Sequence, residues 1–183
     1  MSVAISAIER HGVVTFKGSP VTLAGPELKV GQAAPDFTLA TNDLTPLTLK
    51  DALADNTRAA LLIVVPSIDT SVCSLETAKF NTHVAALPAD KLAAFTISVD
   101  LPFAQKRWAT AENVTNLRLV SDYKTHAFGI AYGVWIKELG LLARSIFLID
   151  KSGILRTIAI VPEVAQEPDY DKVLSDARET ISA

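Results

Sequence analysis

The residue of this chain best suited to chemistry is its single cysteine, Cys73. It ends the run Pro66–Cys73, which follows an apolar stretch over 59–65 with the character of a fully buried strand. Residues 74–80 then favour a helix, so the thiol is expected in or near a first helical turn. The unpaired N–H groups and the helix dipole there favour an anion, and the thiolate is the reactive form of cysteine. The position predicts a nucleophile.

The alternative is a structural thiol, because free cysteines often serve as small buried hydrophobes. Three features of the run favour chemistry instead. Pro66 stops the strand, since its φ is fixed and it lacks an N–H. Thr70 lies three residues before the sulfur and is expected to cap the helix with a hydroxyl that also faces the thiol. Ser71 and Ser74 add polar groups that a core thiol would not need.

Length and composition narrow the classes of protein. The 183 residues are expected to form one domain over 1–183, with 49% hydrophobic and 20% charged residues. A net charge of −3 without a basic cluster argues against nucleic acid or an anionic membrane as a partner. The apolar runs have strand length, which predicts no transmembrane helix. The first ten residues lack the positive start of a secretory signal, so a cytoplasmic location is expected.

Other site chemistries find little support in the sequence. One cysteine excludes an intramolecular disulfide and a cysteine-based zinc site. His11, His83 and His126 are scattered without metal-ligand spacing, which favours surface or capping roles. The eight glycines form no phosphate-binding loop.

The order of elements predicts an α/β fold with a mixed central sheet, flanking helices and an N-terminal β-hairpin. A second hairpin is expected around Lys151-Ser152-Gly153, and Pro168 is expected in the first turn of a final helix. Strands are expected at 13–16, 21–23, 37–41, 44–49, 59–65, 92–99, 117–120, 145–150 and 155–160, and helices after Cys73, at about 102–112, at 124–130 and after Pro168.

The helix after Cys73 carries a stripe of residues on one face. Glu76, Phe80, Val84 and Leu87 follow Cys73 by three, seven, eleven and fourteen residues. The apolar members are expected to face the sheet, which would recess the sulfur behind a narrow opening. A buried carboxylate at Glu76 would disfavour the thiolate and would itself need a partner.

A nearby guanidinium would meet both needs of Glu76, and two arginines are candidates. Arg144 directly precedes the strand at 145–150, and Arg107 lies in the helix at 102–112. The alternative for Glu76 is an ordinary solvated carboxylate on a helix surface.

The pattern Pro66-x-x-x-Thr70-x-x-Cys73 resembles the active-site signature of peroxiredoxins, and the full run looks like that of their thiol peroxidase subfamily. The likeness extends over nearly the whole chain, through segments in the same order. These are Val14–Gly18 with Pro20–Leu23, Lys29–Gly31 with Ala34–Leu39, Asp100–Gln105, and Glu167–Tyr170.

The resemblance implies a thioredoxin-like fold, reduction of hydrogen peroxide and organic hydroperoxides, no metal or organic cofactor, and a homodimer. It implies that Cys73 is the peroxidatic cysteine and that Thr70 hydrogen-bonds the thiolate and the peroxide. It further implies that Pro66 shields the site and that Arg144 is the active-site arginine. Thioredoxin or another thiol would be the reductant.

One position departs from the subfamily pattern. A resolving cysteine usually lies in the helix that follows Asp-Leu-Pro-Phe, and by register Ala109 occupies that place. Either the chain is naturally a one-cysteine peroxidase, or Ala109 is an engineered replacement that blocks disulfide formation. The ordinary landmarks on both sides favour the replacement.

Two readings from other classes remain open. The chain could be a non-enzymatic redox sensor, in which oxidised Cys73 changes the affinity for a partner, or a structural thioredoxin-like module with an inert thiol. Leu101, Phe103 and Trp108 are similarly open, as the apolar wall of an alkyl hydroperoxide site or as core residues.

Overall fold

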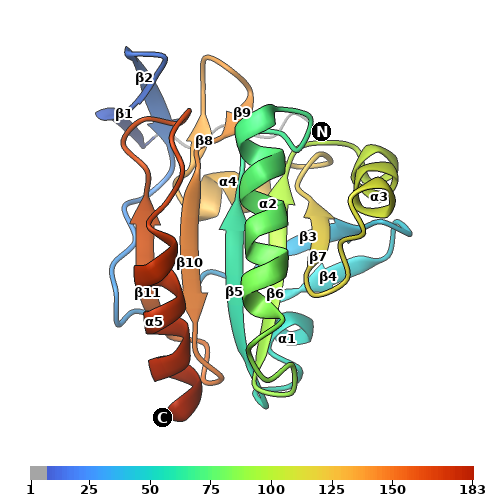
Figure 1. Cartoon of the computed structure of the whole chain (residues 1–183). Coiled ribbons are helices and arrows are strands. Elements are labelled where there is room, and N and C mark those ends of the chain that lie inside the picture. Colours follow the sequence, from blue (N-terminus) through green and yellow to red (C-terminus); the bar gives the residue numbers. More distant parts are fainter. Residues whose placement is uncertain (1–7) are drawn as a thin grey trace.

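The computed structural model describes residues 8–183 (Figure 1). The first seven residues, part of the segment used above to argue against a secretory signal, lie outside this range. Along the chain the elements are β1 (Glu9–Phe16), β2 (Ser19–Ala24), β3 (Thr38–Thr41), β4 (Pro46–Thr48), α1 (Leu49–Ala52), β5 (Ala59–Val64), α2 (Ser71–Val84), β6 (Leu92–Ser98), α3 (Pro102–Ala111), β7 (Arg118–Ser121), α4 (Ala127–Ala131), β8 (Trp135–Ile136), β9 (Leu141–Leu142), β10 (Ser145–Ile149), β11 (Leu155–Ile160) and α5 (Tyr170–Ser182).

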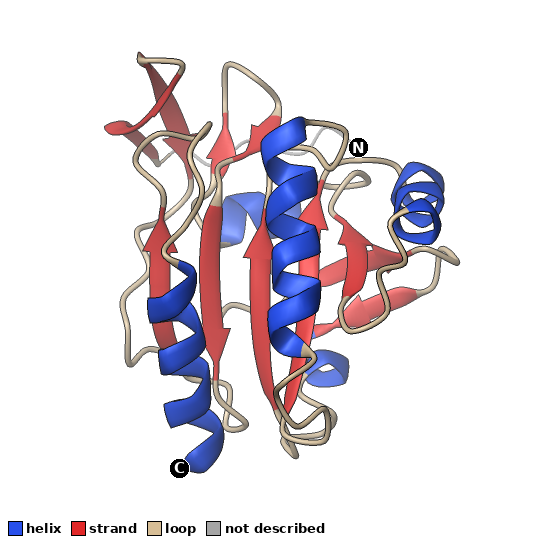
Figure 2. Ribbon diagram, in the orientation of Figure 1, coloured by secondary structure: helices blue, strands red, loops and turns tan. Residues whose placement is uncertain are grey.

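The central sheet has seven strands in the order β11-β10-β5-β6-β7-β3-β4. The strands β5, β6 and β7 are parallel, and the other neighbours are antiparallel, so the predicted mixed sheet is confirmed. Figure 2 shows the sheet from one face, with α2 and α5 in front of it and α4 behind it.

The strand β5 shows why the sheet is buried on both faces. Successive side chains of a strand point to opposite faces. Leu61 and Ile63 join a buried cluster with Phe80 of α2, whereas Leu62 and Val64 join a cluster on the other face that includes residues of α4 and of the hairpin. Both faces are apolar because both are covered: α2 and α5 pack on one face, and α4 and a second, smaller sheet pack on the other.

The second sheet has four strands in the order β1-β2-β8-β9. Its β1–β2 hairpin confirms the predicted N-terminal hairpin, with longer strands than the sequence indicated. Lys17 and Gly18 form the turn with positive φ angles of 51° and 79°. In Figure 1 this hairpin lies at the upper left, at the same end of the molecule as the start of α2.

Several elements differ from the prediction. The strand expected at 44–49 is shorter and leads into α1, which begins after Thr48 because Thr48 and Asp51 form a reciprocal capping box. The short helix begins only at Ala127, after His126 in the left-handed conformation. The final helix begins after Asp169, whose side chain accepts from Lys172 N, so Pro168 precedes the helix. The strands β8 and β9 were not predicted.

No helix within residues 8–183 is long and apolar enough to cross a bilayer.

Candidate active site

The site begins where β5 ends. Pro66 is buried and follows the strand, and a loop then leads to α2. The carboxylate of Asp100 holds this loop, because Ser67 Oγ donates to it at 2.7 Å and Ile68 N at 2.8 Å. Ser98 Oγ donates to the same carboxylate at 2.6 Å. Asp100 thus fixes the loop from the end of β6, a role that the sequence did not indicate.

Cys73 lies in the first turn of α2. Thr70 is the N-cap residue, and its carbonyl accepts the Ser74 N–H at 2.9 Å. The earlier N–H groups of such a turn have no partner within the helix, and the first turn holds no acidic residue. The local field at the sulfur therefore favours an anion.

The Thr70 side chain does not cap the helix as predicted. Its hydroxyl donates to the Ser67 carbonyl at 3.0 Å, and no side-chain capping bond forms. The short loop brings that carbonyl within reach, and a threonine hydroxyl readily bonds a nearby backbone group instead of a helix N–H.

Arg144 reaches the sulfur from β10. In the antiparallel pairing of β10 with β5, Ser145 lies opposite Val64, which places Arg144 beside the loop that follows β5. The guanidinium Nη2 donates to Cys73 Sγ at 3.1 Å, Nη1 forms an ion pair with Glu76 Oε2, and Nε donates to the Val164 carbonyl at 2.9 Å. Each nitrogen of the guanidinium therefore has its own acceptor.

The three side chains are almost completely buried. The exposed fraction is 1% for Cys73, 0% for Glu76 and 1% for Arg144. Glu76 is therefore a buried partner of the arginine, and the solvated reading is wrong. Arg107, the other candidate, is exposed and lies 4.0 Å from Asp69.

This burial makes the charges interdependent. A buried charge is tolerated where an opposite charge and hydrogen bonds compensate for lost water. Glu76 Oε2 has the guanidinium, whereas Glu76 Oε1 has no hydrogen-bond partner among the described residues. The guanidinium faces one carboxylate and one sulfur, so the arrangement places a positive charge next to the sulfur and offers donors to an oxygen that approaches it.

The helix α3 packs beside the start of α2. Trp108 Nε1 donates to Ser74 Oγ at 3.1 Å, and Trp108 is buried in the cluster that contains Cys73. Leu101 and Phe103 are 54% and 63% exposed. Trp108 is therefore a core residue, and the other two are neither core nor the wall of an enclosed site.

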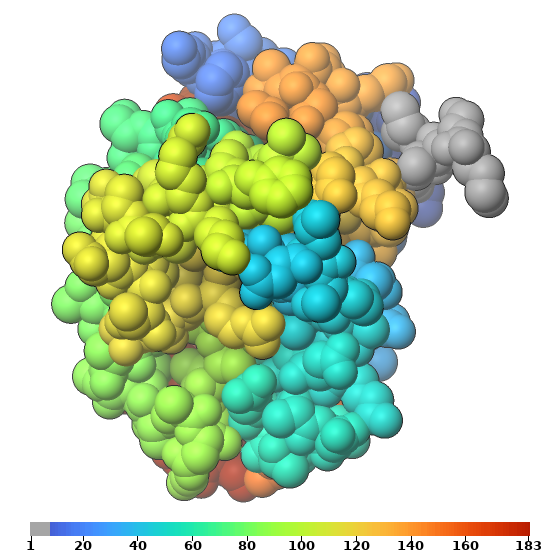
Figure 3. Space-filling model, turned by 90° about the vertical axis from the view of Figure 1, so that its right-hand side faces the viewer, coloured from blue at the N-terminus to red at the C-terminus, as the bar shows by residue number. Residues whose placement is uncertain are grey.

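Ala109 is half-buried on α3. It packs against the same cluster and lines a cavity of about 270 Å³ with Asn42 and Asp43 from the turn between β3 and β4. Lys106 of α3 forms an ion pair at 2.7 Å with Asp43, which links α3 to the turn between β3 and β4. In Figure 3 the yellow-green segment of α3 lies next to the light-blue β3–β4 segment.

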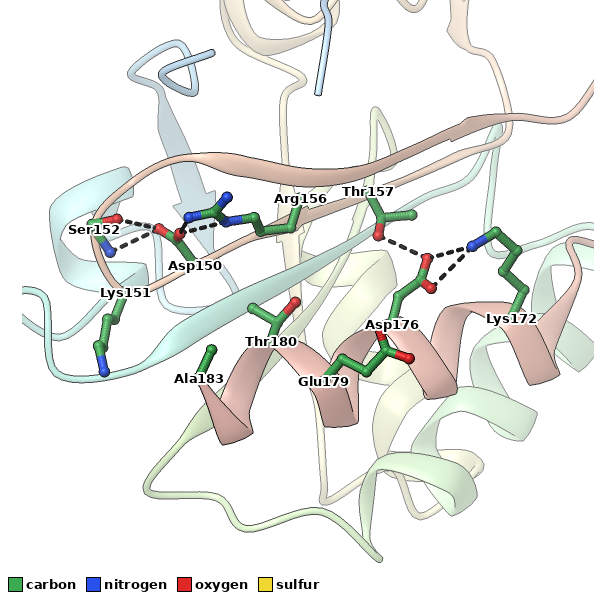
Figure 4. A pocket seen from close by; sticks show the side chains of 10 residues that line it. All are labelled: Asp150, Lys151, Ser152, Arg156, Thr157, Lys172, Asp176, Glu179, Thr180 and Ala183. Carbon is green, nitrogen blue, oxygen red and sulfur yellow. Dashed lines mark hydrogen bonds and ion pairs between the residues drawn. The ribbon is translucent and has the colours of Figure 1, made fainter. Parts of the chain in front are cut away.

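A cavity of about 600 Å³ lies at the opposite end of the sheet, between the β10–β11 turn and α5 (Figure 4). Its charged side chains are largely paired with one another, as in Asp150 with Arg156 and Asp176 with Lys172. Because Cys73 lies at the other end of β5, this cavity is separate from the candidate site. Within residues 8–183 no three His, Cys, Asp or Glu side chains gather as metal ligands.

Comparisons with known proteins agree with the geometry. Residues 30–158 match the AhpC/TSA family model. The thiol peroxidase of Halalkalibacterium halodurans is 46% identical over 165 residues, which cover 90% of this chain and 96% of that protein. The thiol peroxidase of Bacillus subtilis is 44% identical with the same coverage of both chains.

Solved structures give the same assignment. The crystal structure of a peroxiredoxin-like protein from Aquifex aeolicus matches with a TM-score of 0.84 and 41% identity, over 91% of this chain and 96% of that one. A thiol peroxidase from Chromobacterium violaceum matches with a TM-score of 0.79 at 20% identity, over 91% and 95%, and supports the thioredoxin-like fold alone. The chain therefore belongs to the AhpC/TSA family and, within it, to the thiol peroxidase subfamily of the peroxiredoxins.

Proposed function

We propose that this chain is a thiol-dependent peroxidase that reduces hydrogen peroxide and organic hydroperoxides at Cys73. The observation that carries the proposal is the 3.1 Å contact between Arg144 Nη2 and Cys73 Sγ in the first turn of α2. The relatives named thiol peroxidase support the class of reaction.

The reaction is a two-electron oxidation of sulfur. The Cys73 thiolate attacks the terminal peroxide oxygen in line with the O–O bond, an S–O bond forms, and the O–O bond breaks. The distal oxygen leaves with the electron pair and takes a proton to become water or an alcohol. Cys73 is left as the sulfenic acid.

Charge develops on the two peroxide oxygens as their bond breaks, so donors aimed at them lower the barrier. Arg144 Nη2 and the free N–H groups of the first turn of α2 are such donors. The Thr70 hydroxyl joins them by turning away from the Ser67 carbonyl when peroxide arrives. Pro66, buried at the end of β5, keeps water from the sulfur.

Regeneration requires a thiol from outside the chain, because Cys73 is the only cysteine. One thiol, from thioredoxin or another reductant, condenses with the sulfenic acid to a mixed disulfide and water, and a second thiol releases Cys73. We expect fast consumption of one equivalent of peroxide and poor turnover with thioredoxin. The Ala109→Cys variant is expected to restore turnover if Ala109 replaces a resolving cysteine.

The homodimer and the cytoplasmic location are further parts of this proposal. Three large apolar side chains are exposed around the start of α2 and α3: Leu75, Leu101 and Phe103, at 49%, 54% and 63%. Leu101 follows Asp100, whose carboxylate binds the loop before α2, and Leu75 lies two residues after Cys73. Burial against a second copy would remove the three apolar side chains from water. Light scattering of the parent and of Phe103→Ser tests this, since a monomeric parent would contradict it.

Mass spectrometry of Cys73 before and after one equivalent of peroxide tests the central proposal. The expected result is the gain of one oxygen at Cys73 within the reaction's first turnover. Cys73→Ser should leave the peroxide unconsumed. An unmodified Cys73 in a protein that still consumes peroxide would disprove the assignment.

A further inference from the structure

The third contact of Arg144 is with a loop. Its Nε donates to the carbonyl of Val164, which follows β11 and is itself buried. The position of a loop carbonyl depends on the contacts that hold the loop. The contacts that fix the segment 161–165 therefore also affect the position of the Arg144 guanidinium.

The β1–β2 hairpin fixes this segment through its backbone. Thr15 N donates to the Pro162 carbonyl at 2.7 Å, and Val164 N donates to the Thr15 carbonyl at 2.9 Å. These two bonds bracket Glu163, which pairs with Thr15 as an isolated parallel bridge. The carbonyl that binds Arg144 belongs to the same residue whose N–H is tied to the hairpin.

The side chain of Glu163 closes the connection. Its carboxylate accepts from Thr15 Oγ1 at 2.9 Å, Lys17 N at 3.0 Å, Gly18 N at 2.9 Å and Ala165 N at 3.0 Å. The positive φ angles at Lys17 and Gly18 let the turn present two consecutive N–H groups to one carboxylate. Backbone donors, first those of Ala165 and Gly18, lower the pKa of Glu163 to about 2, so it is ionised at neutral pH.

We propose that Glu163 is a positioning residue for the peroxidase site, clamping the hairpin turn onto the 161–165 loop so that the Val164 carbonyl holds Arg144 on Cys73. The inference rests on the role of Arg144 proposed above. During the reaction Nη2 must shift its hydrogen bond from sulfur to the peroxide oxygens. Glu76 and Val164 are then the two contacts that keep the guanidinium in place.

A purely structural role for Glu163 is the competing explanation, and the chain contains a matched control. Glu138 also binds the hairpin, because both of its carboxylate oxygens accept from Thr22 N of β2, at 3.1 and 2.9 Å. It follows β8, and among residues 8–183 its carboxylate accepts from Thr22 N rather than from the 161–165 loop. Glu138→Ala therefore loosens the same hairpin without touching the Val164 carbonyl.

The test compares Glu163→Ala, Glu163→Gln and Glu138→Ala in the full chain. Stopped-flow fluorescence measures the rate of Cys73 oxidation by hydrogen peroxide, and the pH profile of iodoacetamide labelling reports the thiolate. Glu163→Ala is expected to lower the oxidation rate about tenfold, or about 1.4 kcal/mol, because the donor is no longer preorganised. Its labelling midpoint should move to higher pH.

The other two variants separate positioning from stability. Glu163→Gln retains one acceptor oxygen, enough for Lys17 N and Ala165 N but not for Gly18 N, so it should recover part of the rate. Glu138→Ala should lower the melting temperature while leaving the oxidation rate and labelling profile at the parent values. An unchanged rate and profile in Glu163→Ala, or an equal loss in Glu138→Ala, would overturn the inference.

Two further variants complete the test. If Glu163→Ala does not fold, Glu163→Asp takes its place, since the shorter carboxylate keeps the charge but cannot reach the turn N–H groups. A parental rate in Glu163→Asp would then overturn the inference. Arg144→Ala identifies which proposal has failed: a parental rate there refutes the role of Arg144, whereas a loss there without one in the Glu163 variants refutes only the positioning.

Discussion

The two ends of the central sheet each hold an arginine–carboxylate pair, and the pairs have opposite character. At the end where β5 stops, Arg144 and Glu76 are 2% and 0% exposed at their side chains. At the other end, Arg156 and Asp150 are 50% and 12% exposed and lie beside the open cavity of Figure 4. The same kind of ion pair is thus buried in protein at one end of the sheet and partly exposed to solvent at the other.

This difference decides what each pair does. Exposed pairs contribute little, because solvent screens their charges and the two side chains lose conformational entropy when the pair forms. A buried pair adds little net stability either, but neither partner tolerates the loss of the other. The pair of Arg144 and Glu76 therefore holds a positive charge next to the sulfur. The pair of Arg156 and Asp150 is expected to contribute little beyond its own turn.

Removing the two arginines should give the largest contrast. Arg144→Ala is expected to slow Cys73 oxidation about a hundredfold or more, because a donor to the developing charge is lost. It should also lower the free energy of unfolding by about 3–5 kcal/mol, because Glu76 is left buried without a counter-charge. Arg156→Ala should cost less than about 1 kcal/mol and leave the rate unchanged. Stopped-flow oxidation and urea unfolding measure both quantities, and equal effects of the two variants would break the comparison.

The carboxylate of the buried pair can be neutralised without changing its shape. Glu76→Gln keeps an oxygen that accepts from Arg144 Nη1, but it removes the negative charge, so that the sulfur is the one remaining partner of the guanidinium within residues 8–183 that can carry such a charge. We expect a loss of about 2 kcal/mol in the free energy of unfolding, because a neutral amide oxygen replaces the charged acceptor of the buried guanidinium. The pH profile of iodoacetamide labelling should move to lower pH, because the positive charge is no longer shared. A shift to higher pH would show that Glu76 acts mainly through the position of Arg144.

Two aspartates extend the comparison to the loops. Asp100 binds the loop before α2, and Asp150 binds its own turn through Ser152 and Ile154. Asp100→Asn should slow Cys73 oxidation about tenfold, since an amide cannot accept from all three donors that hold the loop at its reacting geometry. Asp150→Asn should leave the oxidation rate at the parent value. A slow Asp150→Asn variant would show that the two ends are coupled.

The sequence predicted the parts of the site that follow a local rule. The helical spacing of Cys73 and Glu76 placed both on the face toward the sheet, and a buried carboxylate next to a thiol required a cation. Arg144 was one of two candidates, and its register with β5 decides between them. The mixed sheet and the hairpin followed from apolar runs and turn residues.

The missed parts come from contacts that no periodic pattern encodes. Asp100 and Val164 act on the site across 32 and 20 residues, through loops whose path depends on the assembled sheet. The Thr70 hydroxyl was misplaced because a cap residue has a competing backbone acceptor at Ser67. The strands β8 and β9 have two residues each, too few to show an alternation.

Acid titration should give the smallest contrast between the two ends. Burial raises the pKa of Asp150, but hydrogen bonds from Ser152, Ile154 and Arg156 outweigh it and leave the pKa below its usual value. A carboxylate with a lowered folded pKa stabilises the fold above its unfolded pKa and loses that contribution as the pH falls through the folded value. Asp150→Asn should therefore melt below the parent at neutral pH, and the gap should narrow at about pH 3.5. Melting curves of the parent and of Asp150→Asn at the two pH values measure the gap. If the gap for Asp150→Asn is the same at both values, the turn is held by neutral hydrogen bonds, and the two ends of the sheet differ less in their electrostatics than their burial indicates.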